Sequence, residues 1–206
     1  FKIIYELNFI NLKRSIILKD NRIIKNIALS AFLLIIYIVT YFLAPEYGIS
    51  IEPIDFFTAA GCIIGICLLF FRLPSAYYYV LALFACAAQY FGMMFHFYER
   101  FSFFDLLLHF SSGFLLTMYG NYFCRFLVKK YSHPGIPAVI TVLFSVFFAV
   151  TGAVIWEIYE FLADRFLGMT SQGIGVADTM EDLIAGSLSA VICGILLFFL
   201  RSKTKT

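Results

Sequence analysis

Three short segments hold most of the residues that are able to do chemistry in this chain. They read FDLLLH over residues 104–109, WEIYEFLAD over 156–164 and ADTMED over 177–182. Within each segment a set of ionisable residues recurs three or four positions apart, so on a helix the members of that set share one face. We therefore expect three polar ridges facing a common centre, formed by Asp105 with His109, by Glu157 with Glu160 and Asp164, and by Asp178 with Asp182.

A histidine among carboxylates is typical of a metal site. One imidazole with two to four acids suits zinc, manganese or iron, whereas oxygen ligands alone suit magnesium or calcium. A bound divalent ion would activate water and polarise a phosphoryl or acyl oxygen. We predict a catalytic role for Asp105, which orients His109, and for Glu160. The predicted metal ligands are His109, Glu157, Asp178 and Asp182.

A second interpretation assigns these acids only structural roles. Acidic residues are ordinary at a helix N-terminus, where Asp105 and Asp178 would serve as caps. Glu157 and Glu160 fit this interpretation less well, because they lie at the predicted C-terminal end of a span, where the helix dipole disfavours negative charge. His109, one turn inside its span, also needs a partner.

The elements that position these residues are membrane-spanning helices. Of 206 residues, 62% are hydrophobic and 14% charged, with a mean hydropathy of +0.92. This composition is far more apolar than that of a soluble domain. The net charge of +2 gives no basis for nucleic-acid binding. All five cysteines fall in or beside apolar runs, so we expect no disulfides.

The apolar runs predict an all-α, polytopic membrane helix bundle of about six transmembrane helices. Residues 1–26 form a basic amphipathic interfacial segment, residues 27–201 the transmembrane domain and residues 202–206 a cytoplasmic tail. The N-terminal stretch lacks a short apolar core with a cleavage site, so we expect no removable signal peptide. The predicted spans are 27–44, 54–71, 76–95, 105–125, 137–160 and 180–200.

The positive-inside rule orients the spans. A cytoplasmic N-terminus and C-terminus leave only Arg100 and Arg165 outside, and they place most acids on the outer side. Counting about 1.5 Å per residue from the cytoplasmic side, His109 lies about 24 Å above Arg125 and Asp182 about 28 Å above Arg201. Glu157, counted from Pro137, lies at about 30 Å. We therefore predict that these groups converge near one plane at the outer surface.

The segments FDLLLHFSSG, WEIYEFLADRFLG and SQGIGVADTMEDLIAG resemble the YjdF-like family of small bacterial inner-membrane proteins, and more loosely VanZ-like proteins. The resemblance covers roughly residues 100 to 192. It implies a polytopic fold in the bacterial plasma (inner) membrane. It also adds Gln172 and Gly173 to the candidate site residues, and we predict that these two bind substrate. Val176-Ala177 stands before Asp178, where the family pattern has Trp. The VanZ-like likeness implies a role in the cell envelope.

Three functions fit these observations. The first is a metal-dependent membrane hydrolase or phosphatase-like enzyme that acts on a lipid or lipid-linked envelope substrate. Its expected cofactor is zinc, manganese, iron or magnesium, and membrane lipids are its expected partners. The second is a transporter or channel coupled to a cation or to protons. The third is a noncatalytic envelope accessory or immunity protein. The sequence has no GxSxG, HExxH or Walker-type glycine loop, which disfavours the enzyme classes that use those motifs.

Overall fold

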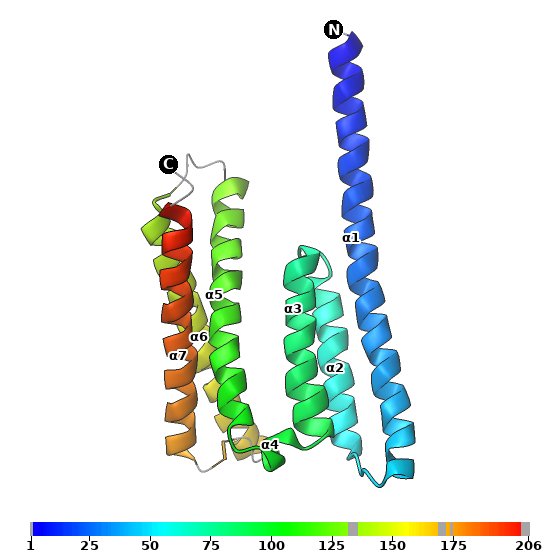
Figure 1. Cartoon of the computed structure of the whole chain (residues 1–206), viewed down its shortest axis with the longest axis vertical. Helices are drawn as coiled ribbons and strands as arrows, with labels where there is room; N and C mark the ends of the chain where they lie inside the picture. Colours follow the sequence, from blue (N-terminus) through cyan, green and yellow to red (C-terminus); the bar gives the residue numbers. More distant parts are fainter. Residues whose placement is uncertain (1, 132–135, 169–171, 174, 203–206) are drawn as a thin grey trace. The chain divides into compact units, whose positions relative to one another are not determined.

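The computed structural model describes residues 2–131, 136–168, 172–173 and 175–202, without the side chains of residues 2–19, 167, 201 and 202. Within these ranges the chain is helical and has no strand, which confirms the predicted all-α fold (Figure 1). Residues 203–206 of the predicted tail lie outside the described residues. The elements are α1 (Lys2–Leu43), η1 (Ala44–Tyr47), α2 (Pro53–Phe70), α3 (Ser75–Ala85), the π-helix η2 (Cys86–Met94), α4 (Phe97–Arg100), α5 (Phe104–Lys130), α6 (Ala138–Leu167) and α7 (Val176–Ser202).

Among the described residues, five helical stretches are long and apolar enough to cross a membrane. They are Asp20–Tyr47, Pro53–Phe70, Ser75–Met94, Ala138–Phe166 and Val176–Leu200. They match five of the six predicted spans and confirm a polytopic helical membrane bundle. The remaining predicted span corresponds to α5, whose 27 residues are long enough to cross. Its apolarity is lower than that of the other five, because Asp, His, Ser, Thr and Asn residues interrupt its apolar sequence.

The chain consists of two compact units, Phe1–Arg100 and Phe101–Thr206. In the first unit, hydrogen bonds join α1 to the helices that follow it. The buried Asn26 side chain donates to the backbone carbonyls of Phe71 and Leu73 at 2.9 and 3.0 Å, and the Ser30 and Tyr78 hydroxyls lie 2.5 Å apart. Because these groups are removed from water, the bonds specify which helix faces meet.

Helix α1 runs without a break from Lys2 to Leu43. The predicted boundary between an interfacial segment and the first span, at residues 26 and 27, therefore lies within one continuous helix. The interfacial position of residues 1–26 and the single transmembrane domain over residues 27–201 stay predictions.

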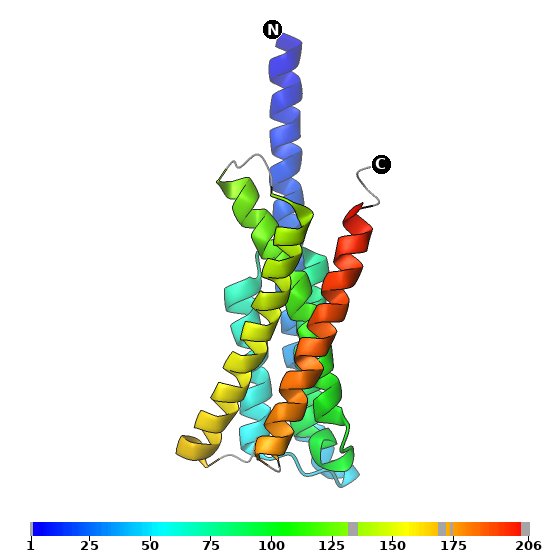
Figure 2. The same ribbon diagram turned by 90° about the vertical axis from the view of Figure 1, so that its left-hand side faces the viewer.

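The second unit consists of α5, α6 and α7, which run side by side, each in contact with the other two (Figures 1 and 2). Glycines allow this close approach. A Cβ at Gly113 of α5 would collide with the Gly186 carbonyl oxygen and the Ser189 hydroxyl of α7. A Cβ at Gly152 of α6 would lie 2.8 Å from Leu116 of α5. Small residues at such contacts are the usual means of packing helices in membranes.

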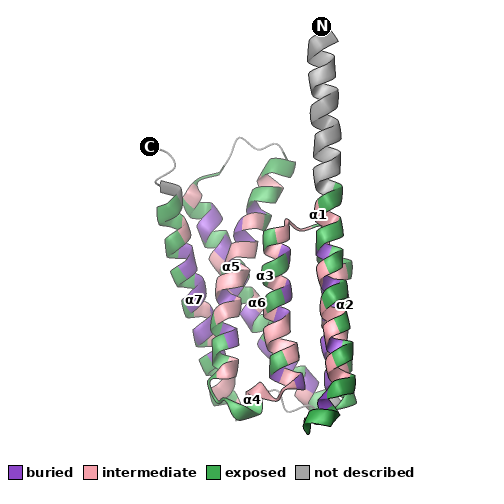
Figure 3. Cartoon of the chain, turned by 45° about the vertical axis from the view of Figure 1, so that its right-hand side comes forward, coloured by how far each residue is buried: buried purple, intermediate pink, exposed green. Residues whose placement is uncertain are grey.

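The outer faces of the helices are apolar. Figure 3 shows exposed residues along the outward side of each helix and buried residues along the side that faces its neighbours. In the second unit, large exposed side chains such as Phe147, Ile155 and Phe161 lie on the outward side. These side chains are the expected contacts for lipid tails, whereas several of the buried side chains between the helices are polar.

Candidate functional site

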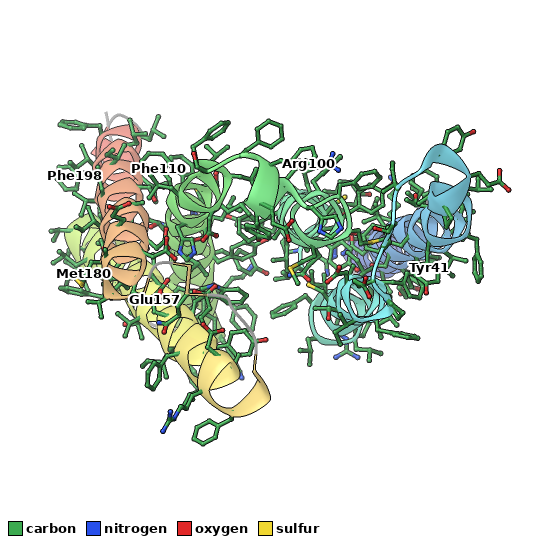
Figure 4. All side chains as sticks on the ribbon, turned by 90° about the horizontal axis from the view of Figure 1, so that it is seen from below. Tyr41, Arg100, Phe110, Glu157, Met180 and Phe198 are labelled. Atoms are coloured by element: carbon green, nitrogen blue, oxygen red, sulfur yellow. The ribbon has the colours of Figure 1, made fainter. Side chains whose placement is uncertain are left out.

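The candidate site lies at one end of the second unit. Because successive helices run in opposite directions, the start of α5, the final third of α6 and the start of α7 come together there (Figure 1). Figure 4 looks along the helices from this end and places Glu157 where α6 meets its two neighbours, while Met180 lies on the outside. The three polar segments of the sequence are thus brought to one place.

His109 is the centre of the cluster. Its Nε2 atom lies 3.6 Å from Asp105 Oδ1 on the same helix and 3.9 Å from Asp182 Oδ2 on α7. Its Nδ1 atom lies 3.5 Å from Glu157 Oε1 on α6. The two ring nitrogens therefore face different carboxylates, and each of the three helices contributes at least one acid. The predicted convergence of these groups is confirmed, and their position at the outer surface of the membrane stays a prediction.

The cluster is largely removed from solvent. His109, Glu157, Glu160 and Asp182 are all buried, with 8% or less of their surface exposed, whereas the Asp105 side chain is 31% exposed. Among the described residues, no Lys or Arg side chain forms an ion pair with these acids. Glu157 Oε1 is buried and has no hydrogen-bond partner. Buried carboxylates are rare without a compensating charge or proton, so this cluster needs one or the other.

In the part of the chain that the structure describes, two overlapping groups have ligand atoms close enough to hold one metal ion. One consists of Asp105, His109 and Asp182, and the other of His109, Glu157 and Glu160. In each group the ligand atoms lie within 4.8 Å of one another. Five of the six predicted catalytic and metal-binding residues are thus assembled. Asp178, a predicted ligand, belongs to neither group and lies beside the loop that precedes α7.

Trp156 also belongs to the cluster, although no role in the site was predicted for it from the sequence. Its indole Nε1–H donates a 2.8 Å hydrogen bond to Glu160 Oε1. This bond fixes one oxygen of Glu160, whose carboxylate has an oxygen within 4.8 Å of a His109 ring nitrogen. The four-residue spacing on a helix, which places Trp156 one turn before Glu160, is the signal that could have identified it.

The loop between α6 and α7 is attached to both helices by Gln172. Its backbone N–H donates to Asp164 Oδ2 at 2.9 Å, and its side-chain Nε2 donates to the Thr179 hydroxyl at 3.0 Å. These contacts show that Gln172 positions the loop, and its predicted role in substrate binding stays a prediction. Gly173 is exposed with φ +40°, and a Cβ there would lie 2.6 Å from Asp178 Oδ2.

Two structural expectations from the sequence are wrong. Helix α6 continues to Leu167, so Glu157 and Glu160 precede its last turn. The helix dipole acts on charges only within that last turn. The dipole therefore gives no argument about these two acids. The capping interpretation of Asp105 also fails, because the cap position of α5 is Phe103 and no side chain bonds there.

Comparisons with known proteins agree with the membrane fold. The sequence profile of the family described as "Predicted membrane protein (DUF2238)" matches residues 26–203. A protein of Thermotoga maritima named "Uncharacterized protein" is 32% identical over 114 residues, which cover 55% of this chain and 56% of that relative. No solved structure matches. Neither description uses the YjdF-like or VanZ-like name, so the first resemblance stays an expectation and the second has no support.

Proposed function

This chain belongs to the DUF2238 family of predicted membrane proteins, and we propose that it binds a divalent cation in an outward-facing site and acts as an enzyme on a lipid or lipid-linked substrate of the cell envelope. The observation that carries the proposal is the position of buried His109 among acids of three helices, 3.5 to 3.9 Å from each of three carboxylates. The two separations from Nε2, 3.6 and 3.9 Å, are beyond the limit of a hydrogen bond, and the 3.5 Å from Nδ1 is at that limit. They suit ligand atoms that surround one ion.

Charge supports the presence of a cation. Asp105, Glu157, Glu160 and Asp182 face one another with no Lys or Arg among their described ion-pair partners. Neighbouring carboxylates in such a setting disfavour one another's ionisation unless a positive charge offsets them. A divalent ion supplies that charge within reach of several acids, and the mixture of imidazole and carboxylate ligands favours zinc, manganese or iron over magnesium.

The proposed chemistry follows from the position of the site. A bound ion would activate water and polarise a phosphoryl or acyl oxygen. Of the chain's own groups, Glu160 is held by Trp156 and is the proposed proton acceptor. Asp105 is partly open to solvent, which would give a headgroup access. By the positive-inside rule this end of the helices faces outward, in the bacterial plasma membrane, and exposed Gly173 is the proposed substrate contact in the loop.

Metal analysis of the purified protein tests the proposal. We expect about one divalent ion per chain in the unmodified protein, and we expect His109→Ala to abolish binding. His96→Ala is the matched control, because His96 lies in the other unit, beside Glu99. Absence of stoichiometric metal in the unmodified protein, or unchanged occupancy in His109→Ala, would overturn the proposed site.

A second candidate function is transport of a cation or of protons. It is favoured by polar side chains buried between the three helices, namely Thr117, Asn121, Thr141, Ser145 and Ser189. Three of their hydroxyls donate to carbonyls of their own helix, and no acidic or basic residue lies between His109 and Arg125 on α5 or between Asp182 and Arg201 on α7. This path lacks the ionisable relay that we expect of a proton pathway.

Flux measurements in liposomes separate the two functions. If cation flux occurs and disappears in Glu157→Gln, transport replaces catalysis as the proposed function. If metal is bound and no flux is measured, the enzyme proposal stands.

A further inference from the structure

The two nitrogens of His109 face two different sets of acids, and this asymmetry carries a further inference that rests on the proposed metal site. Nε2 faces Asp105 and Asp182, and Nδ1 faces Glu157. A neutral imidazole has one nitrogen with a free lone pair and one that carries a hydrogen. His109 can therefore be a ligand in only one of the two groups at a time, while its other nitrogen donates a hydrogen bond.

The hydrogen-bond partners distinguish the two arrangements. If the metal bound Nδ1, the Nε2–H would face two carboxylates, Asp105 and Asp182, and could satisfy only one of them. If the metal binds Nε2, both of these acids can join it as ligands. The Nδ1–H then points at Glu157 Oε1, the buried oxygen that has no other hydrogen-bond partner. Only the second arrangement gives every facing oxygen a partner.

Exposure favours this choice, and the distances are compatible with both arrangements, since the 3.5 Å between Nδ1 and Glu157 Oε1 fits either a ligand pair or a long hydrogen bond. Ligand atoms at about 2.1 Å from a tetrahedral ion lie about 3.4 Å apart. The Nε2 separations of 3.6 and 3.9 Å need only a few tenths of an ångström of contraction to reach that value. Asp105 is also the one partly exposed member, so an ion on this side has a coordination position that water or substrate can reach, as a catalytic metal requires. The other group is buried throughout.

We propose that Asp105, His109 Nε2 and Asp182 bind the metal, and that Glu157 is a positioning residue that accepts the Nδ1–H of His109. A carboxylate in this place fixes the orientation of the ring and the nitrogen that is free to coordinate. The assignment differs from the sequence prediction, in which Asp105 oriented His109 and Glu157 was a ligand.

Co²⁺ is the probe for this inference, because its visible absorption spectrum reports the ligand set directly. In Asp182→Asn or Asp105→Asn we expect the band positions to change, since a ligand is altered. In Glu157→Ala we expect unchanged band positions and an affinity about 10 to 100 times weaker, the loss typical of removing a group that orients a ligand. Glu157→Gln keeps an oxygen that can accept the Nδ1–H, so it should recover most of the affinity.

Glu181→Gln is the matched control, because Glu181 is the exposed acid that adjoins Asp182 and should affect neither spectrum nor affinity. Altered bands in both Glu157 variants, with unchanged bands in the Asp105 and Asp182 variants, would overturn the inference and assign the metal to Glu157 and Glu160. If Glu157→Ala does not fold, Glu157→Gln still decides between the two sets. If the unmodified protein binds no Co²⁺ or Zn²⁺, the proposed metal site itself is wrong, and the inference falls with it.

Discussion

Adding one methyl group at Gly113 should weaken the site from a distance. Gly113 lies one helical turn after His109 on α5, and Gly186 lies one turn after Asp182 on α7. A Cβ at Gly113 would collide with the Gly186 carbonyl oxygen and would lie 2.8 Å from its carbonyl carbon. Ordinary contacts begin at about 3.4 Å, so α5 and α7 must separate by at least about 0.6 Å.

That separation is large enough to affect metal binding. His109 Nε2 and Asp182 Oδ2 already lie 3.9 Å apart, and moving the helices apart by at least about 0.6 Å would increase this distance to about 4.5 Å or more. Two ligands at about 2.1 Å from one ion can lie at most about 4.2 Å apart. We therefore expect Gly113→Ala to weaken Zn²⁺ binding by about tenfold or more, and to destabilise the fold by about 1–3 kcal/mol through overpacking.

The assay is Zn²⁺ titration and thermal unfolding of detergent-solubilised protein, with Gly186→Ala as the matched control. A Cβ at Gly186 would lie 3.5 Å from its nearest neighbours, which is an ordinary contact, so this variant should bind Zn²⁺ like the unmodified protein. Both variants add one methyl group to the same helix interface. Equal Zn²⁺ affinity in the two folded variants would refute the link between helix spacing and ligand geometry.

Two further predictions concern the surroundings of the site. Trp156→Phe removes the hydrogen bond to Glu160, so we expect a loss of about 1 kcal/mol in unfolding free energy, measured by denaturant titration, and an unchanged stability would contradict the bond. An alanine at position 173 would have to adopt a positive φ, and its Cβ would also collide with the Asp178 carboxylate. An alanine at position 168 would have to adopt a positive φ of 68°, but its Cβ would lie in open space. Thermal unfolding should therefore show a loss of about 1–3 kcal/mol for Gly173→Ala and a smaller one for Gly168→Ala, and the reverse order would contradict the close contact with Asp178.

Much of the helical arrangement follows from the sequence, because a bilayer of fixed thickness requires apolar runs of a certain length. The predicted spans at 54–71 and 76–95 differ by one residue at each end from Pro53–Phe70 and from α3 with η2. The end of α6 was predicted less well. It was placed at residue 160, where the apolar run weakens, whereas the helix continues to a left-handed Gly168. Glycine in this role is a common helix terminator, and it predicts the end better than apolarity does.

The convergence of the site was also predictable, since helical rise alone places His109, Glu157 and Asp182 at similar depth. The roles of the individual acids were not predictable in this way. Whether Asp105 or Glu157 faces Nε2 depends on side-chain rotamers and on the rotation of each helix about its axis, and spacing along the sequence determines neither. The same reason explains why Asp178, four residues before Asp182 on the same face, lies beside Gly173 instead of among the ligand groups.

The polarity of α5 has a consequence for how the protein enters the membrane. A segment leaves the translocon for lipid when its apolar side chains outweigh its polar ones, and α5 satisfies this condition less well than the other five spans. Its buried polar side chains, among them His109 and Thr117, are shielded from lipid only once α6 and α7 pack against them. We therefore expect α5 to enter the bilayer together with the two helices that follow it, so that membrane integration and assembly of the site are one event.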